Sequence, residues 1–142
     1  MSPLERRARL MLWGMCPAYL VYFVLQIVAP TWLTTLPARL ACLAAAAGVH
    51  VTVFAIGSLV FGRKDRGPGL TADERDLAIE GHATRIAYSV LLIGMVFVGM
   101  IMPFNQGGWQ IVNGALLVIV LAETTRNLLV ARGYRGGPRL AH

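Results

Sequence analysis

Two of the ionisable side chains inside long apolar runs, His50 and Glu123, could carry chemistry, because a polar group there is costly and needs a partner. His50 falls near the middle of the second of four such runs, and Glu123 falls in the second half of the fourth. His50 allows three interpretations: a neutral histidine hydrogen-bonded to another helix, a proton-relay or substrate-binding site, or a metal or haem ligand. We favour the first. A haem ligand is the weakest of the three, because the other two histidines, His82 and His142, lie outside the apolar runs and offer no second intramembrane ligand.

Glu123 lies about 21 Å along its helix from Trp109, at 1.5 Å per residue, and is therefore still inside the membrane. An ion pair with Arg126, one turn later, or with Arg85 would neutralise it and join the third and fourth spans. The alternative is a carboxylate that couples proton or cation movement. Gln26 is a lone polar group in the first apolar run, and we expect it to form an interhelical hydrogen bond.

An acidic helix start precedes the third apolar run. Asp73, Asp76 and Glu80 fall within about 60° of one another on a helix, and no lysine or arginine lies three or four residues from Asp76 or Glu80. Glu74 forms a T-x-x-E capping box with Thr71.

The missing cations must come from elsewhere. The candidates are Arg6, Arg7 and Arg9, the loop at 63–66, Arg126 and Arg132. We favour an internal clamp within this charge cluster, which His82 and Arg85 complete. The alternatives are a docking surface for a soluble partner and a divalent-cation site.

Composition indicates a membrane protein. Of 142 residues, 56% are hydrophobic and only 14% are charged, whereas soluble domains carry roughly 25% charged residues. Apolar runs at residues 10–29, 37–61, 84–102 and 109–130 predict four spans, with a polar loop at 62–72 and a basic tail at 131–142. We predict one all-α domain, an antiparallel four-helix bundle in which the third helix extends beyond the bilayer.

The second apolar run carries small residues at every fourth position. Ala44, Gly48 and Thr52 form a small-xxx-small stripe, which is typical of a helix face that packs against a neighbouring helix. Cys16 and Cys42 lie near opposite ends of antiparallel spans, so we expect no disulfide between them.

The distribution of the 13 lysines and arginines predicts the orientation. Arg39 alone lies on one side, and the other twelve share the side of both termini. They are Arg6, Arg7, Arg9, Arg63, Lys64, Arg66, Arg75, Arg85, Arg126, Arg132, Arg135 and Arg139. Both termini are therefore predicted to be cytoplasmic. We therefore attribute the net charge of +6 to membrane topology and not to nucleic-acid binding.

The segment D-E-R-D-x-x-I-E-x-x-A-x-x-x-A-Y, from Asp73 to Tyr88, resembles a signature in a family of small bacterial membrane proteins. The sequence departs from that pattern at Gly81-His82, where a charged or bulkier pair is more usual. The resemblance implies a four-span inner-membrane protein with constraint on this helix start, and it implies no particular activity.

These patterns favour a non-enzymatic inner-membrane protein, an accessory, sensor or immunity-type component that contacts a protein partner through its cytoplasmic face. The alternative is a small transporter or channel, working as a homodimer, that uses His50 and Glu123. No nucleophile–base arrangement or phosphate-binding motif is found, and we predict no cofactor and no metal.

Overall fold

The computed structural model describes residues 3–28, 33–62 and 74–134, and this part of the chain is all-α, without strands. The elements are α1 (Pro3–Val28), α2 (Leu36–Gly62), α3 (Glu74–Met100), α4 (Met102–Asn105) and α5 (Gly108–Gly133). The predicted all-α class is confirmed. The capping residue Thr71, the acidic Asp73, the loop at 63–66 and His142 lie outside the described residues.

Four of the described helices are long and apolar enough to cross a membrane, namely α1, α2, α3 and α5, with mean hydropathies from 1.6 to 2.2. The chain is therefore a multi-pass membrane protein. The helices are longer than the apolar runs, because charged turns continue them. α3 begins at Glu74, whereas its apolar run begins at residue 84.

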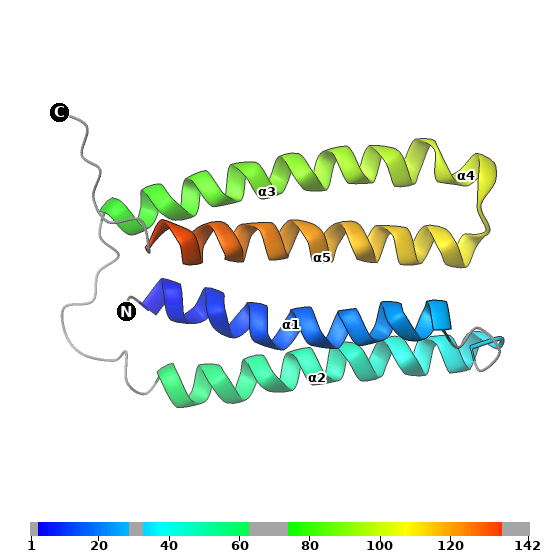
Figure 1. Cartoon of the computed structure of the whole chain (residues 1–142), viewed down its shortest axis with the longest axis horizontal. Coiled ribbons are helices and arrows are strands. Elements are labelled where there is room, and N and C mark those ends of the chain that lie inside the picture. The colour runs from blue at the N-terminus through cyan, green and yellow to red at the C-terminus, as the bar shows by residue number, and fades with distance from the viewer. Residues whose placement is uncertain (1–2, 29–32, 63–73, 135–142) are drawn as a thin grey trace. The chain divides into compact units, whose positions relative to one another are not determined.

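The chain divides into two compact units, Met1–Leu70 and Thr71–His142. Within the first, α1 packs along α2, and within the second, α3 packs along α5 (Figure 1). Each pair is antiparallel, so each unit is a helical hairpin. We call them the first and the second hairpin.

The first hairpin packs through glycines that let the two helices approach closely. A Cβ added at Gly57 would lie 2.3 Å from a methyl carbon of Leu10, and one added at Gly14 would lie 3.1 Å from a methyl carbon of Val53. Tyr22, with only 1% of its surface exposed, completes this core. No hydrophobic effect drives helices together in lipid, so close packing of the two backbones stabilises the hairpin instead.

The small-xxx-small stripe predicted as a packing face does not contact α1. Ala44, Gly48 and Thr52 are exposed, and a Cβ added at Gly48 would meet nothing within 4 Å. α2 instead turns Ala46 and Gly57, both buried, toward α1. The predicted packing of this stripe on a neighbouring helix is therefore not made with α1, and it stays a prediction for any other helix.

The second hairpin uses the same kind of contact along its whole length. A Cβ added at Gly94 would lie 2.4 Å from a methyl carbon of Val118, and one added at Gly133 would lie 2.8 Å from a methyl carbon of Ile79. Gly114 similarly faces the sulfur of Met102. These contacts fix which faces of α3 and α5 meet, and so they position the polar side chains at the end of the hairpin.

The connection between α3 and α5 is short. α4 carries Pro103 at its start, and α5 begins after Gly107, whose backbone N–H donates to the side-chain oxygen of Gln110 at 2.7 Å. This reversal sets the register in which the start of α3 meets the end of α5. We call that end of the second hairpin the charged end.

Candidate functional site at the charged end of the second hairpin

An ion pair joins the two helices at the charged end. Arg126 of α5 donates from Nη2 to the Glu80 carboxylate of α3 at 2.6 Å, and from Nε to the hydroxyl of Thr84 at 3.3 Å. Both side chains of the ion pair are partly exposed, at 35% for Arg126 and 39% for Glu80. One arginine therefore binds two consecutive turns of α3, and Glu80 has its counter-ion from 46 residues away in the sequence.

The Asp76 carboxylate accepts a hydrogen bond from a hydroxyl group and not from an arginine. The hydroxyl of Tyr134, the C-cap residue that follows α5, donates a hydrogen bond to the Asp76 carboxylate. Sequence reasoning missed Tyr134, because it searched for cations and placed this residue in the basic tail. A phenol hydroxyl can also donate a hydrogen bond to a carboxylate, but no spacing in the sequence indicates that Tyr134 does so.

Asp76 and Glu80 are thus turned toward α5, as the internal clamp requires. Glu74, by contrast, is exposed at the first residue of α3. Within the described residues no group of three or more His, Cys, Asp or Glu side chains is arranged to hold a metal ion. We call the contacts among Asp76, Glu80, Arg126 and Tyr134 the clamp.

Another face of α3 carries three exposed residues, Leu77, Arg85 and Tyr88, and the half-buried Gly81. Leu77, Gly81, Arg85 and Tyr88 follow one another at spacings of four, four and three, so they share one face of the helix. Leu77 is 60% exposed and Tyr88 58% exposed, and a Cβ added at Gly81 would meet nothing within 4 Å. We call these four residues the exposed stripe.

His82, next to the exposed stripe, is exposed as well. Nearly all of Ala83 and Ala87 is buried on the other side of the helix, with 1% and 7% of their surfaces exposed. The face that carries Arg85 and His82 is therefore distinct from the face that packs on α5.

Glu123 does not form the predicted ion pair with Arg126, because Arg126 binds Glu80 instead. Arg85 lies on the exposed stripe of α3 and does not pair with Glu123 either. Among the described residues Glu123 has no ion pair and its side chain is exposed, while its backbone carbonyl accepts a hydrogen bond from Asn127 at 2.8 Å. The register between α3 and α5 determines that Arg126 pairs with Glu80 and not with Glu123. Spacing along one helix cannot predict that register.

The remaining candidates lie in the first hairpin. His50 of α2 contacts the ring of Tyr19 of α1 edge-on, with ring centroids 5.8 Å apart and an angle of 74° between the planes. Its imidazole thus packs against an aromatic ring at the helix interface. Gln26 lies one turn after Tyr22, and its amide nitrogen is buried without a hydrogen-bond partner, so that nitrogen does not make the expected interhelical bond.

Comparison with known proteins assigns the chain to no family. No family model matches the chain, and neither a curated protein nor a solved structure matches it. The resemblance of the segment from Asp73 to Tyr88 to a bacterial membrane-protein signature stays a prediction. Three features of the described residues bear on function: the clamp, the exposed stripe and the carboxylate of Glu123, which has no ion pair there.

Proposed function

We propose that the protein is a non-enzymatic component of a bacterial inner membrane, an accessory, sensor or immunity-type protein that contacts a protein partner at its charged end. The observation that carries this proposal is the exposed stripe on α3. Its leucine and tyrosine are more than half exposed, and Arg85 lies between them. Aromatic, arginine and apolar side chains together are typical of the central part of protein interfaces.

The clamp indicates which surface of α3 is available to the partner. Because Asp76 and Glu80 are held by Tyr134 and Arg126, the acidic side chains are not available as the docking surface. The exposed stripe is then the surface of α3 that is available for docking. With twelve of the 13 lysines and arginines on the side of the termini, the positive-inside rule places the charged end in the cytoplasm, where a soluble or membrane-bound partner reaches it.

The test is photo-crosslinking in cells. A photoreactive amino acid replaces Leu77 in one variant and Ile93 in a matched control, which is 74% exposed on the same helix but lies in its apolar half. We expect position 77 to yield a protein adduct of one size and position 93 to yield none. Adducts with lipid alone at position 77 would make the stripe an interfacial anchor and would rule the proposal out.

A transporter or channel is the second candidate, and Glu123 favours it. An exposed carboxylate without an ion pair in the described residues is costly in hydrocarbon unless water, a cation or another subunit reaches it. A homodimer is the natural form, since four spans rarely enclose a pathway. The measurement is flux of protons and alkali cations into proteoliposomes. Equal flux for the wild type and for Glu123→Gln would eliminate this candidate.

A further inference from the structure

The second hairpin presents two opposite charges that have no ion pair among the described residues. Glu123 of α5 and Arg85 of α3 are both exposed, and neither takes part in the ion pairs that the described residues form. Glu123 is also the only Asp or Glu of the sequence that falls inside an apolar run. A carboxylate at that depth is costly unless an opposite charge or water reaches it.

Arg85 is the arginine that can neutralise Glu123. The apolar runs contain three arginines, of which Arg126 binds Glu80, and Arg39 is predicted on the opposite side of the membrane. Within one chain Arg85 does not bind Glu123, because it lies on the exposed stripe of α3. The Arg85 that pairs with Glu123 must then belong to a second copy of the chain.

Arg85 and Glu123 lie at similar depths in the second hairpin. Gly133 of α5 faces Ile79 of α3. Arg85 lies six residues from this contact along α3, and Glu123 lies ten residues from it, in the same direction, along α5. The difference of four residues corresponds to about 6 Å at 1.5 Å per residue. An arginine side chain is long and can extend along the membrane normal, so it can bridge that difference.

Glu123 shares one side of the second hairpin with exposed apolar residues. Arg126 identifies this side, because it reaches across to the hydroxyl of Thr84. Glu123 precedes Arg126 by three residues and Tyr88 follows Thr84 by four, so both lie on the same side. Arg85 precedes Tyr88 by three residues and borders it. We call this side the Glu123 face, and it consists of Thr84, Tyr88 and Met95 of α3 and Val112, Ile119 and Glu123 of α5.

The composition of the Glu123 face suits a helix interface. Its aromatic and aliphatic members, Tyr88, Met95, Val112 and Ile119, are between 41% and 58% exposed within one chain. Two copies inserted in the same orientation are related by an axis along the membrane normal, which preserves depth. Such an interface is self-complementary, so each copy supplies the carboxylate of one ion pair and the guanidinium of the other.

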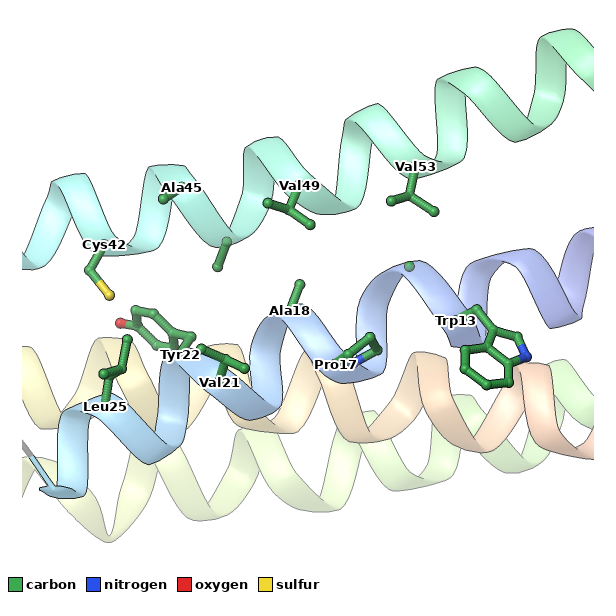
Figure 2. A pocket seen from close by; sticks show the side chains of 12 residues that line it. Trp13, Pro17, Ala18, Val21, Tyr22, Leu25, Cys42, Ala45, Val49 and Val53 are labelled. Carbon is green, nitrogen blue, oxygen red and sulfur yellow. The ribbon is translucent and has the colours of Figure 1, made fainter.

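The groove of the first hairpin has no matching charge. This groove has a volume of about 420 Å³ and lies between α1 and α2 (Figure 2). Its lining extends from Trp13 to Leu25 on α1 and from Cys42 to Val53 on α2, and it includes no charged side chain. The groove therefore offers no counter-ion to Glu123 or Arg85.

We propose that two copies of the chain pair through the Glu123 face, with Glu123 of each copy bound to Arg85 of the other. Charge complementarity selects this occupant over lipid tails, which offer no counter-ion to either side chain. The inference goes beyond the proposed function, because it assigns Arg85 and Tyr88 to a second copy and leaves Leu77 to the partner proposed above.

Photo-crosslinking of the full chain in membranes tests the face. Two versions of the chain with different affinity tags are expressed together, and a photoreactive amino acid replaces either Tyr88 or, as a matched control, Ile93. Ile93 is exposed on the same helix, but five residues later it lies about 140° around the helix axis. We expect an adduct that carries both tags at position 88 and none at position 93. No adduct at position 88, or an adduct within a single chain, would overturn the proposal.

Neutral variants test the ion pair itself, with the association constant of the dimer measured by sedimentation equilibrium in micelles. Glu123→Gln and Arg85→Gln should each lower this constant at least about tenfold, as expected for a close charge pair at an interface. The double variant should associate no more weakly than either single variant, because both changes remove the same pair. Losses that add in the double variant, or an unchanged constant in both single variants, would contradict the proposal.

Matched variants separate a lost pair from a folding defect. Arg85→Lys keeps the charge and should retain most of the association. Glu74→Gln and Arg132→Gln remove exposed charges outside the Glu123 face and should leave the association constant unchanged. An equal loss in these two controls would show that net charge, and not the pair, holds the dimer together, and would overturn the proposal.

Failure of this inference is distinguishable from failure of the proposed function. A photo-adduct of Leu77 with another protein, without a dimer adduct at Tyr88, would overturn the dimer and leave the proposed function standing. In dilute micelles, where the chains are single, the pair with Arg85 is absent. Unfolding under those conditions measures only the contacts within one chain.

Discussion

At the scale of single residues, the acidic start of α3 is explained by two partners far away in the sequence. Glu80 binds Arg126 and Asp76 binds Tyr134, at separations of 46 and 58 residues. The sequence predicts that both carboxylates need partners, because their own helix offers none. It cannot predict which partner binds, because that depends on the register of α3 against α5.

Removing the hydroxyl of Tyr134 tests the hydrogen bond to Asp76. Tyr134→Phe should lower the stability of the second hairpin by about 1 kcal/mol, since the carboxylate then loses a donor. Tyr88→Phe, on the exposed stripe, is the matched control and should have no measurable effect. Reversible unfolding in mixed micelles measures both. Equal losses would mean that the phenol of Tyr134 contributes only through its ring.

Neutralising Glu123 and Arg126 separately distinguishes a paired charge from an isolated one. Glu123→Gln should leave stability unchanged or raise it, because an exposed carboxylate without an ion pair gains nothing from its charge in an apolar environment. Arg126→Gln should destabilise the hairpin, because it releases Glu80 and Thr84 together. The same unfolding measurement applies. A loss with Glu123→Gln equal to that with Arg126→Gln would show that Glu123 has a partner of its own.

At the scale of elements, the existence of the helices is readable from apolar runs, but the packing faces are not. α2 carries two sets of small residues, one through Ala44 and Gly48 and another through Ala46 and Gly57. Only the first has the small-xxx-small spacing, whereas Ala46 and Gly57 share one face at a separation of eleven residues. Only the second contacts α1, because the partner helix must also offer side chains such as Leu10 that fit against it.

The glycines of α3 give a matched pair for testing this packing. Gly94→Ala should destabilise the second hairpin by about 1–3 kcal/mol, because the new Cβ would lie 2.4 Å from Val118, a stiff β-branched side chain. Gly99→Ala adds the same methyl group where nothing lies within 4 Å and should be neutral or mildly stabilising. Similar effects of the two substitutions on unfolding would contradict the assigned face of α3.

At the scale of the whole molecule, composition alone indicates the class. Few charges in the sequence and four long apolar helices in the described part of the chain indicate a multi-pass membrane protein. The orientation stays a prediction from the segregation of the basic residues, which acts during insertion and leaves no trace in the contacts.

Cysteine labelling tests the orientation. After Cys16 and Cys42 are replaced by alanine, a single cysteine is introduced either at Gly108, where α5 begins, or at Arg132, near its end. A membrane-impermeant maleimide should label position 108 in cells with a permeable outer envelope, and position 132 only after the inner membrane is opened. The reverse pattern would invert the topology and place the charged end outside the cytoplasm.

A double-mutant cycle on Glu80 and Arg126 tests the clamp most directly. Stability is measured for the wild type, Glu80→Gln, Arg126→Gln and the double variant under identical conditions. We predict that the sum of the two single losses exceeds the measured loss of the double variant by about 0.5–1 kcal/mol, the range for a partly exposed ion pair. Strictly additive losses would contradict the clamp and would leave the acidic start of α3 free to bind another protein.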